Sequence, residues 1–249
     1  MARIEVNGVE LFYIEGGEGT ETVVLSHGLL MDYTMFAPQW DMLAEDYRVV
    51  AYDHRGQGRS GNTPDGEDLD SLTNDAADFI ALLGRGPVHF IGMSMGGMVG
   101  LRLAARFPQL VRSLVLIDTS AQPEPWLQRL RFGLMCALVP LLGVKPFLSQ
   151  ALAMMFGPST HKDPAKQPLL EKWREKLAAL PPGIVRQVRG VMNRKDVSDE
   201  LAGIRCPTLV VFGGEDALTP AACSWRIATR INNAEAVRIE NAGHSSNLE

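Results

Sequence analysis

The chain has 249 residues, 46% of them apolar, which is enough for one large α/β domain or for one domain that carries a sizeable insertion. Its 24 Lys and Arg residues stand against 29 Asp and Glu residues, and the charges are interspersed, so nucleic acid is not expected as a partner. Three widely spaced cysteines without a C-x-x-C pair, and charged residues where a signal peptide needs an apolar stretch, predict a protein of the cytoplasm.

The first half of the chain alternates strand-like and helix-like segments, which is typical of a parallel sheet. Residues 3–15 alternate around the tight-turn pair Asn7-Gly8 and predict a β-hairpin at a sheet edge. Ser71 is the expected N-cap of one helix and Gly84 its expected C-terminal stop. The predicted strands that follow the hairpin are residues 22–26, 48–52, 88–93 and 113–118, and the predicted helices are 35–45, 71–83 and 98–107.

The pattern changes after Thr119. Residues 121–200 contain no strand-like run, are interrupted by nine prolines and consist of helix-like pieces, which predicts an inserted helical cap. Within it, the apolar run 132–144 is broken by Pro140 and is too short to span a bilayer, so no membrane span is expected. Alternation returns with strands at 207–212 and 236–239 around a helix at 221–231, so the predicted core comprises residues 1–120 and 201–249.

A serine lies where a predicted strand turns sharply into a helix, in the run Gly92-Met93-Ser94-Met95-Gly96. A serine hydroxyl is a weak nucleophile at neutral pH, and such a turn helps it by holding the oxygen clear of the backbone, beside the unpaired N–H groups of the helix N-terminus. Glycines at positions 92 and 96 allow the bend. The run resembles the G-x-S-x-G elbow of α/β-hydrolases, so Ser94 is the expected nucleophile.

Two further side chains complete a predicted catalytic triad. Asp216 follows the strand that ends at Phe212, and His244 follows the last strand. Carboxyl ends of parallel strands share one edge of a sheet, so these side chains can meet Ser94 there, in the chain order of an α/β-hydrolase. His244 is expected to take the serine proton and Asp216 to orient and stabilise the imidazole. Asp118, which also ends a strand, is the alternative acid.

The oxyanion of a tetrahedral intermediate needs hydrogen-bond donors. The backbone N–H of Met95, directly after the serine, and that of Leu29, after His27-Gly28, are the expected donors. His27 is expected to order its own loop and not to act as a base, and Asp53 is expected to hold the turn after its strand.

Five motifs together resemble the α/β-hydrolase family over the whole chain. They are Ser26-His27-Gly28, the run from Asp53 to Ser60, the Ser94 elbow, Gly214-Glu215-Asp216 and Gly243-His244. The resemblance implies a mostly parallel eight-stranded sheet flanked by helices, with the cap after the sixth strand. The run from Gly92 to Met98, with Asp118-Thr119-Ser120, is most similar to 3-oxoadipate enol-lactonases and their esterase relatives.

The function expected from these motifs is hydrolysis of a small, largely apolar ester or lactone through an acyl-enzyme on Ser94, with no metal or organic cofactor. The cap is expected to form the roof of the substrate pocket with apolar side chains. The candidates are Trp126, Phe132, Met135, Phe147, Met154, Met155 and Phe156.

Several alternatives remain open from the sequence. The same triad serves cofactor-free haloperoxidases, perhydrolases and carbon-carbon bond hydrolases, and the fold also occurs as a non-catalytic ligand-binding module. The exposed face of the cap could contact a membrane surface, but its prolines and modest length favour a pocket roof. Family members usually continue past the histidine loop into a final helix, whereas this sequence stops at Glu249, so either that helix is missing or the sheet is covered differently. Oligomeric state is not predicted.

Overall fold

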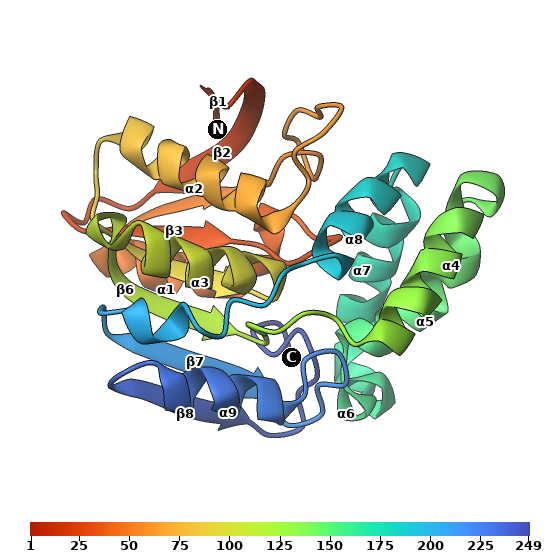
Figure 1. Cartoon of the computed structure of the whole chain (residues 1–249). Helices are drawn as coiled ribbons and strands as arrows, with labels where there is room; N and C mark the ends of the chain where they lie inside the picture. Colours follow the sequence, from red (N-terminus) through yellow and green to blue (C-terminus); the bar gives the residue numbers. More distant parts are fainter.

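The computed structural model describes residues 1–249, which form one eight-stranded sheet with helices on both faces and a group of helices beyond one of its edges (Figure 1). The strand order is β1-β2-β4-β3-β5-β6-β7-β8. The strands are β1 (Ala2–Val6), β2 (Val9–Gly16), β3 (Thr22–Ser26), β4 (Arg48–Tyr52), β5 (Val88–Met93), β6 (Val111–Ile117), β7 (Thr208–Gly213) and β8 (Ala234–Ile239).

The sheet is mostly parallel, as predicted. β1 and β2 form the edge hairpin, and β2 pairs antiparallel with β4, whereas β4, β3, β5, β6, β7 and β8 run parallel to one another. The hairpin turn holds Asn7 and Gly8 at φ 47° and 73°, which is the left-handed conformation that an Asn-Gly pair favours. The predicted α/β-hydrolase fold class is therefore confirmed.

Four helices flank the sheet: α1 (Ala37–Asp46), α2 (Leu69–Leu83), α3 (Met95–Arg106) and α9 (Ala221–Arg230). In Figure 1, α2, α3 and α9 lie in front of the sheet, where they share a core of 31 buried residues with it. α2 begins earlier than predicted, because the Asp68 carboxylate, and not Ser71, accepts hydrogen bonds from the first-turn N–H groups of Asp70 and Ser71. Gly84 ends this helix at φ 65°, as expected.

Residues 121–200, which we refer to as the cap segment, contain five α-helices and no strand. They are α4 (Trp126–Leu142), α5 (Leu148–Met155), α6 (Pro158–Lys162), α7 (Gln167–Ala178) and α8 (Val185–Met192). Figure 1 shows them beyond the carboxyl ends of the parallel strands, with α4 outermost. Buried side chains of α5 and α7, including Met155 and Trp173, pack in one core with Met93 and Ile117 of the sheet. No helix is long and apolar enough to cross a membrane.

The residues after His244 form a turn that is fastened to the rest of the molecule. The Glu249 carboxylate accepts hydrogen bonds from the N–H groups of Gly157 and Gly243, at 2.7 and 2.8 Å, and the Asn247 amide donates to the Met35 carbonyl. These contacts link the histidine loop to the start of α6. On β8, Val237 and Ile239 remain partly exposed.

Candidate active site

Ser94 occupies a strained turn between β5 and α3. Its backbone has φ 49° and ψ −111°, a conformation that non-glycine residues rarely adopt, and strain of this kind is concentrated at functional sites. Two hydrogen bonds hold the turn: the Ser94 N–H donates to the Ile117 carbonyl at 2.8 Å, and the Thr119 hydroxyl donates to the Ser94 carbonyl at 2.7 Å. The turn is therefore fixed by β6 and by the residues just after it.

The glycines around Ser94 allow α3 to approach the sheet. A Cβ on Gly92 would overlap the Gly96 carbonyl, and a Cβ on Gly96 would overlap the Ser26 carbonyl of β3. Both obstacles are backbone atoms, which cannot rotate away as a side chain can. The close contact of helix and strand thus requires glycine at these two positions.

Gly96→Ala is expected to lower the free energy of unfolding by about 2–4 kcal/mol, because the added methyl forces α3 away from β3. Urea denaturation measures this loss. Gly133→Ala is the matched control: a Cβ there meets nothing within 4 Å, so this change inside α4 is expected to stabilise by up to about 1 kcal/mol. Equal urea midpoints for Gly96→Ala and Gly133→Ala would contradict the close contact between α3 and β3 at Gly96.

Three predicted catalytic side chains meet at the carboxyl ends of β5, β7 and β8. Ser94 Oγ lies 2.8 Å from His244 Nε2, and His244 Nδ1 lies 2.8 Å from Asp216 Oδ2. Asp216 is held in turn by Thr219, whose hydroxyl donates to Oδ2 at 2.7 Å and whose N–H donates to Oδ1 at 3.0 Å. The imidazole therefore bridges the serine and the carboxylate, the arrangement that general-base activation of a serine requires.

The electrostatics of this trio favour an ionised Asp216. Burial alone would raise the pKa of Asp216, but the charge and hydrogen bond of His244 outweigh it, so the pKa lies below its usual value. Burial alone would lower the pKa of His244, but the charge and hydrogen bond of Asp216 outweigh that effect and place the pKa above its usual value. The carboxylate thus favours the protonated form of the imidazole.

Asp118, the alternative acid, lies close by but does not hydrogen-bond to His244. Its carboxylate accepts from the Gly213 N–H at 2.7 Å, from the Ser246 N–H at 3.0 Å and from the Ser246 hydroxyl at 2.6 Å. Burial, reinforced by the charge of Asp216, raises the pKa of Asp118 to about 7. Of the two carboxylates, Asp216 contacts the imidazole and Asp118 ties the end of β7 to the histidine loop.

The two expected oxyanion donors have no acceptor within the chain. Neither the Leu29 N–H nor the Met95 N–H makes a hydrogen bond, whereas the neighbouring Leu30 N–H donates to Gln57 Oε1 at 2.8 Å. Leu29 lies beside the serine, since a Cβ on Gly28 would be 3.6 Å from Ser94 Cβ. Buried N–H groups almost always have partners, so two free donors at this place are available to a ligand.

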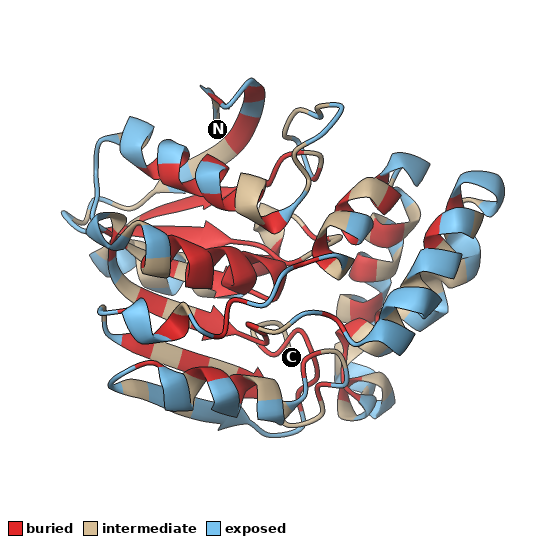
Figure 2. Cartoon of the chain, in the orientation of Figure 1, coloured by how far each residue is buried: buried red, intermediate tan, exposed pale blue.

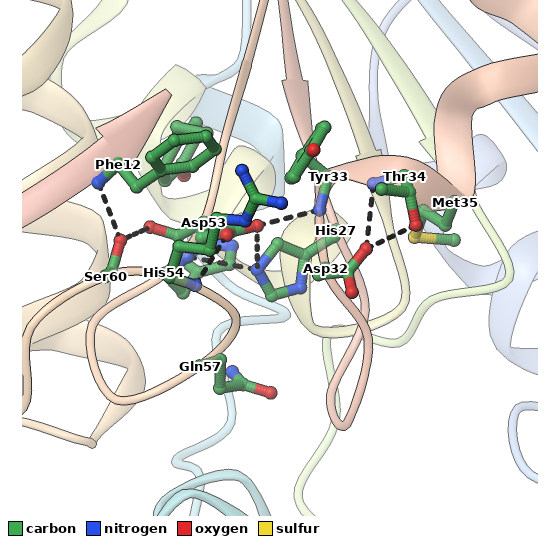
Figure 3. A network of polar contacts seen from close by, with 12 residues as sticks. Phe12, His27, Asp32, Tyr33, Thr34, Met35, Asp53, His54, Gln57 and Ser60 are labelled. Atoms are coloured by element: carbon green, nitrogen blue, oxygen red, sulfur yellow. Dashed lines mark hydrogen bonds and ion pairs between the residues drawn. The ribbon is translucent and has the colours of Figure 1, made fainter. Parts of the chain in front are cut away.

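His27, two positions before Leu29, belongs to a network of polar contacts that includes Asp53 and His54 (Figure 3). His27 Nε2 accepts from the His54 N–H at 3.0 Å, and His27 Nδ1 lies 2.7 Å from the Gly28 carbonyl, so Nδ1 carries the proton. Asp53 accepts from the N–H groups of Tyr33 and Arg59, both at 2.8 Å. Both ring nitrogens of His27 thus have partners in the backbone of the neighbouring loops.

A mostly apolar cavity of about 110 Å³ lies over Ser94 and His244. Fourteen of its 21 lining residues are hydrophobic, from both the core and the cap segment. Methionine is prominent among them and makes the wall adaptable, because its side chain is long and flexible. The lining methionines are Met31, Met93, Met98, Met135, Met154, Met155 and Met192. No group of three or more His, Cys, Asp or Glu side chains is arranged to hold a metal ion.

A family model described as the alpha/beta hydrolase family matches residues 23–249. The chain belongs to the α/β-hydrolase family. RutD of Pseudomonas syringae pv. syringae (strain B728a), which is named as a proposed carbamate hydrolase, is 33% identical over 232 residues, or 91% of this chain and 88% of that protein. RutD of Rhizobium rhizogenes (strain K84) is 30% identical over 92% of this chain and 87% of its own length.

Solved structures of other hydrolases superpose closely on this family member. A thermophilic esterase from Thermogutta terrifontis has a TM-score of 0.91 and 28% identity, covering 100% of this chain and 93% of its own. The enol-lactonase from Burkholderia xenovorans LB400 has a TM-score of 0.88 and 29% identity, covering 99% of this chain and 94% of its own. The resemblance to esterases and enol-lactonases seen in the sequence is thereby confirmed.

The structure divides the candidate pocket residues of this hydrolase into two groups. Phe132, Met135, Met154 and Met155 line the cavity over Ser94, and the other three do not. Trp126 is 75% exposed, at the first position of α4. Phe147 packs against the cluster between α4 and α8, and Phe156 is buried in the core shared with α5 and α7. Because α4 is apolar on nearly every side, its sequence pattern does not show which face turns inward.

The sequence analysis missed a buried ion pair in the cavity wall. Arg194 Nη1 lies 2.7 Å from Glu124 Oε2, both side chains are buried, and both residues line the cavity. Arg194 Nε also donates to the Gln122 carbonyl at 2.8 Å. The partners are 70 positions apart and belong to no short motif, so only the folded chain shows that the wall of this mostly apolar cavity includes a charged pair.

Proposed function

We propose that this hydrolase cleaves a carboxylic ester or lactone of a small, largely apolar substrate through an acyl-enzyme on Ser94. The observation that carries the proposal is the continuous chain of hydrogen bonds from Ser94 Oγ through His244 to Asp216, placed at the floor of an apolar cavity. The esterase and enol-lactonase named above, each 28% or 29% identical, support the same class of reaction.

In the proposed reaction, Ser94 Oγ attacks the carbonyl carbon while His244 Nε2 takes the serine proton. The N–H groups of Leu29 and Met95 stabilise the resulting oxyanion, each contributing about 3 kcal/mol to lowering the barrier. The intermediate collapses, the bond to the leaving oxygen breaks, and His244 delivers its proton to that oxygen. Water then attacks the acyl-Ser94 carbonyl with His244 again as base, which releases the acid and restores the serine.

The cap segment has a role in this proposal as the roof of the pocket. Phe132 and Met135 from α4, with Met154 and Met155 from α5, cover a cavity whose floor is the serine. A volume of about 110 Å³ suits a short acyl group better than a long one. The guanidinium of Arg194 and the carboxylate of Glu124 offer a polar contact at the wall.

Carbamate cleavage is the second candidate. The two RutD relatives described above, which cover over nine tenths of this chain, are named as proposed carbamate hydrolases. A carbamate presents the same carbonyl to the serine and to the oxyanion donors, so the chemistry up to the acyl-enzyme is shared. The two candidates differ in the carbamoylated serine, which hydrolyses more slowly because nitrogen donates electrons to the carbonyl.

The test is a panel of nitrophenyl esters of increasing chain length, small lactones and nitrophenyl carbamates. We expect fastest turnover on short esters or lactones. Negligible turnover of every ester and lactone beside rapid carbamate cleavage would move the assignment to the second candidate. Peroxide-dependent halogenation or dienoate cleavage without ester turnover would contradict both.

Phe132→Ala is expected to shift the chain-length preference of the panel toward longer acyl groups, with kcat/KM for an octanoyl ester relative to a butyryl ester rising about tenfold. Removing the ring enlarges the cavity at the wall, and each additional buried methylene contributes about 0.8 kcal/mol. Phe147→Ala is the control, because Phe147 lies outside this cavity. The same shift in both variants would contradict the described wall.

A further inference from the structure

The outer side of α4 is the most apolar exposed surface of the molecule. Of the twelve large hydrophobic residues that are exposed in the chain, six lie on this one helix of 17 residues. Figure 2 shows α4 as mostly exposed. The six are Trp126, Leu127, Leu130, Leu134, Leu141 and Leu142, with Leu141 80% exposed. We refer to them as the α4 outer face. Scattered apolar residues need no explanation, but a contiguous patch of this kind marks a site of interaction.

The spacing of five of these residues makes them one stripe, and Leu142 lies beside it. At 3.6 residues per turn, Trp126, Leu127, Leu130, Leu134 and Leu141 fall within an arc of about 100°. Cys136 and Val139 point the other way and are buried against α8. α4 therefore has two apolar sides: one packs on the protein and the other has no partner within the chain.

Positive charge surrounds the α4 outer face. Residues 125–162 contain four Lys or Arg residues and no Asp or Glu, which leaves 20 Lys or Arg against 29 Asp or Glu for the rest of the chain. Two surface hollows run beside the stripe. Arg129 and Arg189 line the hollow toward α8, Arg131 lines the hollow toward α5, and neither hollow contains an acidic side chain.

We propose that the α4 outer face binds the surface of an anionic lipid bilayer. A basic helix with leucines and a tryptophan on one face lies in the interface of such a bilayer with its apolar side inserted, and flanking Lys and Arg residues contact the headgroups. A second copy of the chain fits less well, because it would bring Arg129, Arg131 and Lys145 of both copies together without a carboxylate between them. The acidic remainder of the molecule would be repelled, which orients α4 toward the membrane.

The hollows beside the α4 outer face share lining side chains with the cavity over Ser94. Phe132 lines the cavity and both surface hollows, and Met135 and Met154 line the cavity and the hollow beside Arg131. An apolar ester dissolved in the bilayer would therefore meet the part of the cavity wall that these side chains form. This consequence rests on the proposed function, whereas the binding itself does not.

Vesicle flotation tests the binding without any enzymatic readout. Vesicles of phosphatidylcholine with one third phosphatidylserine are expected to carry the protein, and vesicles of phosphatidylcholine alone at least about tenfold less of it, because each Lys or Arg near an anionic surface contributes about fivefold to partitioning. Raising the salt from about 0.1 M to about 0.5 M is expected to weaken the binding. Trp126 emission should shift to shorter wavelength with anionic vesicles, and Trp126→Phe should abolish that shift.

Two double variants distinguish binding by the α4 outer face from nonspecific adsorption of the protein to vesicles. Leu130→Ser with Leu141→Ser is expected to lower partitioning at least about tenfold, as is Arg131→Gln with Lys145→Gln. Met42→Ser with Leu82→Ser removes apolar residues of similar exposure elsewhere and should change nothing. Circular dichroism melting checks that each variant is folded.

Equal binding by the leucine variant and its control, or no binding to anionic vesicles at all, would overturn the proposal. Vesicle-independent dimerisation that the leucine variant loses would show that a second copy occupies the face, and would overturn it as well.

Discussion

Ser94→Ala is expected to lower kcat for ester hydrolysis by about 10⁴-fold or more, with the free energy of unfolding nearly unchanged. The serine oxygen is the atom that forms the acyl bond, and His244 Nε2 at 2.8 Å has no other serine to activate. What activity remains would come from the oxyanion donors and from substrate positioning. Steady-state turnover of the best ester in the panel measures the effect.

Ser245→Ala is the matched control for this change. Ser245 lines the same cavity and is buried, and its hydroxyl has no hydrogen-bond partner. Turnover within about threefold of the parent chain is expected, because neither the hydrogen-bond chain nor the oxyanion donors are altered. If Ser94→Ala and Ser245→Ala had similar activities, the assignment of the nucleophile would be wrong.

Asp216→Asn is expected to lower kcat by about 10⁴-fold, because an amide can hold the imidazole in the wrong tautomer and cannot stabilise its charged form. Asp118→Asn is its matched control, a neighbouring buried carboxylate that makes no hydrogen bond to His244. We expect this variant to lose about tenfold or less, through a looser histidine loop. A larger loss for Asp118→Asn than for Asp216→Asn would make Asp118 the acid.

The pH dependence of kcat/KM provides a second readout for the same pair. His244 must be neutral to act as base, so activity falls as the pH drops through its pKa, which the Asp216 carboxylate holds above the usual value despite burial. Asp216→Asn removes that charge, and the acid limb is expected to move to lower pH. Asp118→Asn is expected to move it in the same direction but less, since Asp118 also raises the pKa of His244. If the acid limb of the pH profile did not move in Asp216→Asn, the Asp216 charge would not be what raises the pKa of His244.

The sheet and the meeting of Ser94, Asp216 and His244 could be predicted because they depend on local patterns. The strands have short Val-rich runs, and the three side chains lie in the segments that follow β5, β7 and β8, so the parallel topology brings them to one edge. The N-cap of α2 lies three residues before the predicted one. Asp68 and Ser71 are both good N-caps, and only the folded backbone shows which one accepts the hydrogen bonds.

Other features could not be predicted because they depend on how distant elements pack. The orientation of α4 is one: Trp126 and Phe132 are both large aromatic residues, but the first faces outward and the second lines the cavity. The Glu124–Arg194 pair is another, since a contact across 70 positions leaves no periodic signal. Asp118 and Asp216 both end strands, and the loops after β7 and β8 decide which one reaches the imidazole.

Mass spectrometry of the acyl-enzyme tests the central claim most directly. The intact chain would be mixed with a nitrophenyl ester, quenched in acid during the first turnovers, and digested to locate any added acyl group. We expect one acyl group per chain on the peptide that contains Ser94, and none in Ser94→Ala. Rapid ester turnover with no adduct, or with the adduct on another residue, would contradict an acyl-enzyme on Ser94.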